Sequence, residues 1–429
     1  MTATYLKSSG LKNYRALGTL ALAFTATCIG LSAQEPRAQT PPARTRPGPV
    51  SGYDTSKTQF RVVTIATGLA HPYKFVILPD KSILVSELWP AQLRIVRDGK
   101  VDPQPIEGLP AIYGGQKIIP RRVGLMAAAL HPHFAENKLV YLTYTKSGDR
   151  GITLALARGS LDGHALKDAR EIFVADAWGG NAEAANSALL FGRDGTLFMT
   201  VGGAIGGKSA ERAQDPNDDL GKILRLRDDG TVPPDNPFVG RAGYKPEIYS
   251  LGHRNEEGLA IEPDTGELWE SEFGPQGGDE INRIRPGRNY GWPFVTLGRT
   301  YPGPREGKFT QEGMEDPWIF WMPGISPSGI MFYTGDVFPE WKGNLFVAAL
   351  QSGRVYDTGH LERIQFNARK EQILNESLLG DLKLRVRDVQ QGSDGLIYVL
   401  ADQDDGTALT DRSGSILRIE PLNTTPGAQ

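Results

Sequence analysis

Cysteine is almost absent from this sequence, because Cys28 is the single cysteine in 429 residues. It lies in an apolar stretch, 16–31, that follows several basic residues and ends close to the small residue Ala33. This order of basic, apolar and small residues predicts a signal peptide over 1–33. The stretch is too short to span a bilayer comfortably, so we expect no stable membrane insertion after its removal. The remaining chain would fold without disulfides in a periplasmic or secreted location.

An excess of one charge is also lacking. The 47 Lys and Arg residues nearly balance the 50 Asp and Glu residues, which gives a formal net charge of -3. Such a balance provides no broad electrostatic attraction for nucleic acid. Residues 34–57, rich in Pro, Arg, Thr and Gln, lack the apolar side chains that form a core, and they predict a disordered linker. We expect 422–429 to be a C-terminal tail.

Turn-forming residues are abundant, with 51 Gly and 30 Pro, which favours a loop-rich all-β protein. From residue 59, a short apolar strand, a turn and a second strand recur six times, at intervals of roughly fifty residues. The first copy is LPDKSILVSE with QLRIVRDG, and the last is GSDGLIYVLAD with GSILRIEP. This pattern predicts an all-β, six-bladed β-propeller over 58–421. We expect 59–75 to close the ring, and the inserts 202–220 and 294–335 to gather at one mouth of its channel.

The run from 248 to 293 concentrates the candidate functional residues. Gly274, Gly277 and Gly278 let the backbone turn its carbonyls toward one point. Asp279 and Glu280 add oxygens of the kind that Ca²⁺ prefers. The residues by themselves leave two interpretations open: a platform for calcium and a ligand, or a β-turn with solvated acids.

Several motifs, taken in order, resemble one family. The segments GHRNEEGLA, EFGPQGGDEIN, NYGWP, AQDPNDDLGKILRLRDDGTVPPDNPF and RVRDV are similar to those of the soluble quinoprotein glucose and aldose sugar dehydrogenases, the glucose/sorbosone dehydrogenase group. The resemblance covers nearly all of 59–421. It implies a small-molecule sugar substrate oxidised at the anomeric carbon, with pyrroloquinoline quinone (PQQ) and Ca²⁺ as cofactors. The sequence does not identify the electron acceptor.

The resemblance assigns cofactor-binding roles to four residues. Arg254 and Asn255 match the pair beneath the quinone, where Arg254 would act in catalysis by stabilising the developing quinol oxyanion. Arg385 and Arg387 match the arginines that bind the cofactor's carboxylates, and planar guanidinium groups suit both kinds of oxygen. Without the resemblance, the RVR pattern indicates two charges on one solvated face of a strand.

Two calcium sites are also implied by the resemblance. The main-chain carbonyls of Gly274 and Pro275 match the positions that hold the cofactor's calcium. Glu280, with the carbonyl of Tyr290, resembles a second, structural calcium site. The alternative for Glu280 is a surface salt bridge. His253 is expected to pack behind the site.

The sequence departs from the family pattern where the chemistry is expected. Ala184 stands where the family has its catalytic His, and alanine accepts no proton. The neighbouring Glu183 is our candidate for a replacement catalytic base, if burial raises its pKa; the alternative is an exposed loop carboxylate. Arg122 replaces a glutamine that contacts the quinone, and Gln351 replaces a lysine. Arg122 therefore joins the predicted cofactor-binding residues and preserves the positive charge of the pocket.

Two other functions are compatible with the same fold, because fold does not determine function. One is a carbohydrate-active enzyme without quinone that works by hydrolysis or elimination, and the other is a non-catalytic binding propeller. Retention of all four residues, Arg254, Asn255, Arg385 and Arg387, favours an anionic cofactor over a protein-binding surface. A quinoprotein sugar dehydrogenase is therefore the leading hypothesis.

Overall fold

A computed structural model describes residues 53–55, 58–114, 123–180, 184, 186–301, 303–304, 307–403 and 412–422. All of them belong to one compact unit, Pro47–Gln429. The predicted signal peptide, most of the linker, Arg122 and Glu183 lie outside the described residues. No helix among the described residues is long and apolar enough to cross a membrane.

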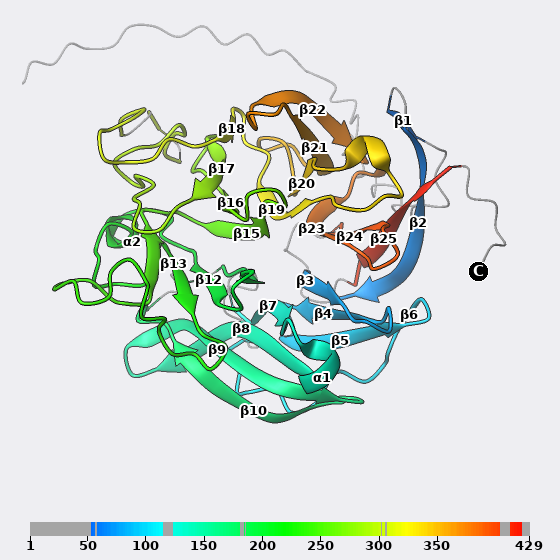
Figure 1. The fold of residues 1–429 in the computed structure, drawn as a ribbon, viewed down its shortest axis with the longest axis horizontal. Coiled ribbons are helices and arrows are strands. Elements are labelled where there is room, and N and C mark those ends of the chain that lie inside the picture. The colour runs from blue at the N-terminus through cyan, green and yellow to red at the C-terminus, as the bar shows by residue number, and fades with distance from the viewer. Residues whose placement is uncertain are drawn as a thin grey trace, which may run out of the picture. The chain divides into compact units, whose positions relative to one another are not determined.

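Six β-sheets surround a common centre and form a β-propeller, as the repeats predict (Figure 1). The first sheet contains β3 (Pro72–Ile77), β4 (Ile83–Glu87), β5 (Gln92–Arg97) and β6 (Lys100–Val101). The second contains β7 (Leu125–Leu130), β8 (Leu139–Gly148), β9 (Gly151–Asp162) and β10 (Ala165–Val174). The third contains β11 (Leu189–Phe191), β12 (Leu197–Val201), β13 (Lys222–Leu226) and β14 (Ile248–Leu251).

The other three sheets complete the ring. The fourth contains β15 (Glu256–Ile261), β16 (Leu268–Glu272), β17 (Asp279–Ile284) and β18 (Ile319–Trp321). The fifth contains β19 (Pro327–Phe332), β20 (Leu345–Ala349), β21 (His360–Phe366) and β22 (Gln372–Leu378). The sixth contains β23 (Arg385–Gln391), β24 (Ile397–Asp402), β25 (Gly414–Pro421), β2 (Thr58–Leu69) and β1 (Tyr53–Thr55). Short helices are α1 (Phe134–Asn137), α2 (Lys208–Arg212), η1 (Pro339–Trp341) and η2 (Gly380–Leu382).

The ring closes through the N-terminal strand. β2 pairs antiparallel with β25, with Val62 opposite Ile419, and so joins the sheet built from the C-terminal strands. The expectation that 59–75 closes the ring is therefore confirmed for β2. The same segment also contains most of β3, the innermost strand of the first blade. Ala70 and His71 separate β2 from β3.

Apolar residues fill the space between neighbouring blades. Each blade packs both faces against its neighbours, so its central strands are buried on both sides: all five residues of β12 and all five of β20 are buried. This explains why the central strands appear in the sequence as continuous apolar runs rather than as an alternating pattern. Trp269 and Trp341 are among the largest fully buried side chains.

The innermost strand of each blade faces the central channel. A cavity of about 480 Å³ is lined by parts of β3, β7, β11, β15, β19 and β23. The polar side chains among its lining residues include Lys74 and Asp388, whose charged atoms lie 3.6 Å apart. The two charged side chains that line this cavity are therefore paired with each other.

Two of the long connections meet at one end of the ring. The Trp292 side chain donates a hydrogen bond to the carbonyl of Ala204, and Gln214 Nε2 donates to the carbonyl of Trp292 at 2.7 Å. The β12–β13 and β17–β18 connections thus contact each other, as expected for inserts at one mouth. The expectation that 294–335 is one insert is wrong, because this range contains all of β18 and all of β19.

Candidate functional site

Arg254 and Asn255 lie in the turn that enters the innermost strand of the fourth blade. Only 7% of Arg254 is exposed. Its guanidinium donates to the carbonyls of Phe273, at 2.7 Å, and Ile205, at 3.3 Å, and lies 5.3 Å from the centre of the Trp292 ring. The positive charge is therefore fixed beside the residue that precedes Gly274.

The Gly274–Gly278 turn is held in one conformation by its own backbone and by Asp279. Gly277 and Gly278 have φ values of 80° and 69°, a region that side-chain-bearing residues seldom occupy. A Cβ on Gly274 would overlap the carbonyl oxygens of both. Asp279 accepts hydrogen bonds from the main-chain N–H groups of Gly274, at 2.9 Å, and Ser326, at 2.6 Å. Burial raises the pKa of Asp279 to about 6. Asp279 thus anchors the turn, and the carbonyls of Gly274 and Pro275 remain the predicted calcium ligands.

Arg385 and Arg387 lie at the start of β23 and share a buried acid. Arg387 Nε donates to Asp402 at 3.1 Å, and Arg385 Nε lies 3.7 Å from the other oxygen of the same carboxylate. Arg385 also donates to the side chain of Gln351 at 3.2 Å. Gln351, which we expect to replace a family lysine, therefore lies beside Arg385, one of the predicted carboxylate-binding arginines. The solvated-face alternative is wrong for these arginines, because only 18% and 21% of their side chains are exposed.

Glu257 links these two groups of residues. Its carboxylate accepts hydrogen bonds from Asn255 Nδ2 and from the hydroxyl of Tyr73, both at 3.1 Å. Burial raises the pKa of Glu257 to about 7, against the opposing effect of Lys74 and Arg387. Asn255 and Arg387, two of the residues that the resemblance assigns to one cofactor, therefore both interact with a buried acid that the sequence did not single out.

Buried acids also gather on one face of the fourth blade. Glu272 lies opposite Glu280 across β16 and β17, and Glu270 lies opposite Asn282. Asn282 Nδ2 donates at 3.2 Å to both Glu270 and Glu272. Oε1 of Glu270 has no hydrogen-bond partner in the part of the chain that the structure describes. Burial, together with the charge of Glu272, holds the pKa values of Glu270 and Glu280 well above their usual range.

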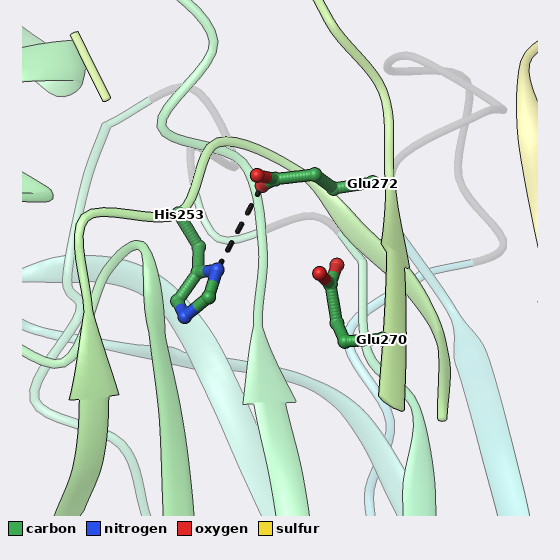
Figure 2. Close-up of side chains that lie close together, drawn as sticks. All are labelled: His253, Glu270 and Glu272. Carbon is green, nitrogen blue, oxygen red and sulfur yellow. Dashed lines mark ion pairs between the residues drawn. The ribbon is translucent and has the colours of Figure 1, made fainter. Parts of the chain in front are cut away.

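His253 approaches the same acids from the third blade. Figure 2 shows its ring and the side chains of Glu270 and Glu272 directed toward one another, with Nδ1 of His253 4.0 Å from Oε2 of Glu272. One ligand atom from each of these residues lies within 4.8 Å of the others. Burial lowers the pKa of His253 to about 3, so the ring is neutral at physiological pH and does not compensate the acids.

Tyr290 packs against His253. Its ring stacks on the imidazole with a centroid separation of 4.7 Å. Its hydroxyl donates to the carbonyl of Arg283 at 2.6 Å, and its N–H donates to the carbonyl of Leu251 at 2.8 Å. The surface-salt-bridge alternative for Glu280 is not supported, because Glu280 forms no ion pair among the described residues and the charges that raise its pKa are those of Glu272 and Asp279. Such a set of carboxylate oxygens with a neutral imidazole fits a divalent cation, which would remove the repulsion between the acids.

Ala184, the position at which the sequence predicts loss of the family histidine, is buried. Ala184 is 0% exposed and packs in a cluster of buried apolar residues that includes Ala177 and Ala204. Glu183, our candidate replacement base, and Arg122 lie outside the described residues. Their predicted roles therefore stay predictions.

Comparison with known proteins connects this geometry to an activity. A profile of the family described as "Glucose / Sorbosone dehydrogenase" matches residues 69–412. The chain belongs to the glucose/sorbosone dehydrogenase family. It is 33% identical to the aldose sugar dehydrogenase YliI of Escherichia coli (strain K12) over 363 residues, which is 83% of this chain and 91% of that protein. It is 39% identical to the uncharacterized protein slr1608 of Synechocystis over 368 residues, 82% of this chain and 87% of the relative.

A solved structure of an aldose sugar dehydrogenase has the same fold. The PQQ-bound form of the enzyme from Streptomyces coelicolor is 28% identical, covers 87% of this chain and 99% of its own, and superposes with a TM-score of 0.66. Membership of this family supports an oxidoreductase that acts on a small-molecule sugar. The motif resemblance and the six-bladed fold expected from the sequence are both confirmed.

Sequence reasoning overlooked several residues of the site. Glu257 is the second of the two adjacent acids in the motif GHRNEEGLA, but the motif alone does not indicate that it is an ionisable group of the site. In LWESE, the acids Glu270 and Glu272 are two residues apart, which places both on one face of a strand. That spacing was a usable signal. The contribution of Tyr73 depends on the packing of distant blades, and no local pattern indicates it.

Proposed function

We propose that this chain is an exported, PQQ- and calcium-dependent sugar dehydrogenase that oxidises a sugar at the anomeric carbon. The observation that carries the proposal is that Asn255 and Arg387 both interact with Glu257, while Arg254, the neighbour of Asn255, donates to the Phe273 carbonyl beside the Gly274–Gly278 turn. Arginines beside a glycine-rich turn whose carbonyls are the proposed calcium ligands suit an anion that is bound together with a cation. We place the protein in the periplasm or outside the cell.

Arg254 and Asn255 would hold the quinone end of the cofactor, while Arg385 and Arg387 would hold its carboxylates. The carbonyls of Gly274 and Pro275 would hold the associated Ca²⁺. When bound, PQQ supplies the acceptor for a hydride from the sugar. Arg254 is already oriented by the Phe273 carbonyl, so its charge needs little rearrangement to stabilise negative charge on an adjacent oxygen.

A second cation would occupy the acidic face of the fourth blade. Glu280 and the carbonyl of Tyr290 remain the proposed ligands, and Glu270 and Glu272 add oxygens on the same face. Because these acids lie close together and raise one another's pKa, calcium binding there would stabilise the fold as well as the position of Arg254.

The base that takes the hydroxyl proton of the sugar differs from the family pattern at Ala184. Glu183 remains our proposal for this role. Replacing Glu183 with Gln should lower the turnover number by about 10²–10⁴-fold while leaving PQQ affinity unchanged. Unchanged turnover would show that another group accepts the proton.

The decisive experiment reconstitutes the purified protein with PQQ and Ca²⁺. We expect a bound-quinone absorption spectrum that bleaches when aldoses are added. Bound quinone without bleaching by any aldose would favour a binding protein or another chemistry. No quinone binding in the presence of Ca²⁺ would contradict the proposal and favour a carbohydrate-active enzyme without quinone.

A further inference from the structure

Glu257 lies where the inner ends of four blades meet. It belongs to β15, and Tyr73, which donates to its Oε2, belongs to β3. The hydroxyl of Tyr73 accepts a hydrogen bond from the N–H of Ser187, just before β11, at 3.3 Å. Arg387 of β23 interacts electrostatically with Glu257. Only 4% of Glu257 is exposed.

Its hydrogen bonds lead directly to the proposed cofactor site. Asn255 donates to Oε1 of Glu257 through Nδ2, and its Oδ1 accepts a hydrogen bond from Asn186 Nδ2 at 2.7 Å. Asn255 is therefore oriented from both ends of its amide. A change in the charge of Glu257 therefore alters the hydrogen bond that orients Asn255. Conversely, a charge bound near Asn255 alters the pKa of Glu257.

The cations near Glu257 are already paired with other acids. Lys74 lies 3.6 Å from Asp388, and Arg387 donates to Asp402 at 3.1 Å. Glu256, the preceding residue on β15, is a second buried acid, and the charge of Glu257 helps to raise the pKa of Glu256. Among the described residues Glu257 forms no ion pair of its own, so its negative charge is only partly compensated.

We propose that Glu257 takes up a proton when a polycarboxylate anion binds at Arg387 and Asn255, so that anion binding and protonation of this carboxyl are coupled. The idea rests on the proposed function for the identity of the anion, but the coupling itself requires only negative charge at that position. A bound carboxylate neutralises the Arg387 guanidinium and adds like charge near Glu257, and both effects favour the neutral carboxyl. The proton comes from solvent, and the O–H bond on Glu257 is the only bond formed.

The pH dependence follows from the direction of this shift. In the free protein the pKa of Glu257 is raised to about 7 by burial. A bound anion raises the pKa of Glu257 further. At pH values below the pKa of the free protein, Glu257 is protonated in both the free and the anion-bound protein, so the affinity for the anion does not change with pH. Between the free and the bound pKa, affinity falls by up to about tenfold per pH unit as pH rises. Above the bound pKa the weaker affinity is again constant.

Calorimetry tests the coupling without measuring enzyme activity. The Ca²⁺-loaded protein is titrated with PQQ at pH 7.5 in PIPES and in imidazole, buffers with different heats of ionisation. The dependence of the observed heat on the buffer gives the number of protons taken up. We expect uptake of several tenths of a proton in the wild type and none in Glu257→Gln. The exposed control Glu340→Gln should behave like the wild type.

A second variant, Tyr73→Phe, tests whether the result for Glu257→Gln reflects only a structural change. Tyr73→Phe removes a hydrogen bond that lowers the pKa of Glu257, so the pH of maximal uptake should move upward while uptake persists. Equal uptake in the wild type and Glu257→Gln, or an unshifted maximum in Tyr73→Phe, would overturn the coupling.

A tricarboxylate without a quinone, benzene-1,2,4-tricarboxylate, separates the coupling from the proposed function. Uptake with this anion and no binding of PQQ would support the coupling and contradict the proposed function. Binding of both anions without uptake at Glu257 would overturn only the coupling. Failure of both anions to bind would overturn both.

Discussion

The main-chain N–H of Arg254 donates a hydrogen bond to Oε2 of Glu272 at 2.7 Å. The same residue thus points its guanidinium toward the Phe273 carbonyl and attaches its backbone to the acidic face of the fourth blade. Anything that moves Glu272 also moves the proposed cofactor arginine. This contact links the two proposed calcium sites through a single residue.

Calcium should stabilise the protein, and Glu272 should be needed for the effect. At a hundredfold excess of Ca²⁺ over its dissociation constant, we expect the free energy of unfolding to increase by about 2.7 kcal/mol. Glu272→Gln removes one of the mutually repelling charges, so it should unfold no more easily than the wild type in EGTA and gain far less stability from CaCl₂. Thermal denaturation with EGTA or CaCl₂ measures both, and Glu312→Gln, at an exposed position, is the control. An equal calcium response in Glu272→Gln would contradict the assignment.

Gly274→Ala should weaken cofactor binding without unfolding the blade. The added Cβ would overlap the carbonyls of Gly277 and Gly278, so the turn must shift. A shift that costs about 1–3 kcal/mol corresponds to a loss of about ten- to a hundredfold in affinity for PQQ in the presence of Ca²⁺. At Gly380 a Cβ would meet no described atom within 4 Å, which makes Gly380→Ala the matched control. Tight binding by Gly274→Ala would show that the turn is not the calcium platform.

Restoring the family histidine should fail in this chain. Ala184 is completely buried among apolar side chains, so Ala184→His should lower the free energy of unfolding by about 1–3 kcal/mol and should not increase sugar oxidation. Ala111→His, at an exposed position, controls for the substitution itself. Urea denaturation and steady-state kinetics together test the prediction. A stable variant with faster turnover would mean that the position has room for a working base.

Acid should weaken one contact between the fourth and fifth blades. Glu262 accepts a hydrogen bond from Lys370 at 2.7 Å and two from Thr265, and these interactions outweigh burial and lower its pKa from 4.5 to about 2. A lowered pKa means that the stabilisation is fully present above about pH 4.5 and is lost as pH falls toward 2. Glu262 is 1% exposed, so the contribution is about 1–3 kcal/mol.

The matched variant for this prediction is Glu262→Gln. It should be less stable than the wild type at pH 7, and the difference should shrink between pH 4.5 and 2. Chemical denaturation at a series of pH values measures the difference. A constant difference over the whole range would show that the Glu262 carboxylate contributes through packing rather than through charge.

The propeller could be predicted because its repeats are local. The paired strands of the six repeats correspond to β4 with β5 in the first blade and β24 with β25 in the last, with equivalent pairs between. The innermost strands were not distinguished, because a strand such as β7, LMAAAL, carries no turn signal or alternation of its own. The sequence also did not show that 294–335 contains β18 and β19.

The site was predictable only as far as its motifs extend. Arg254 and Arg387 were identified by resemblance, and the structure places Arg387 beside Glu257, which accepts a hydrogen bond from Asn255, the neighbour of Arg254. Glu257 and Tyr73 were not, because the importance of a buried acid depends on which cations of other blades are already paired. The burial of Ala184 also depends on three-dimensional packing. The sequence does not show whether an alanine in a loop is exposed or buried.

The pairing of β2 with β25 has a consequence for how the protein matures. Arg61 and Glu420 form an ion pair at 2.8 Å across 359 residues of chain, so the ring closes through contacts between its two ends. Closing so long a loop is slow and entropically costly. The N-terminal strand β2 therefore lacks this partner until the C-terminal strand β25 has been synthesised. Truncation at the C-terminus would leave β2 without β25 and the ring open, so it would affect the start of the chain as well as its end.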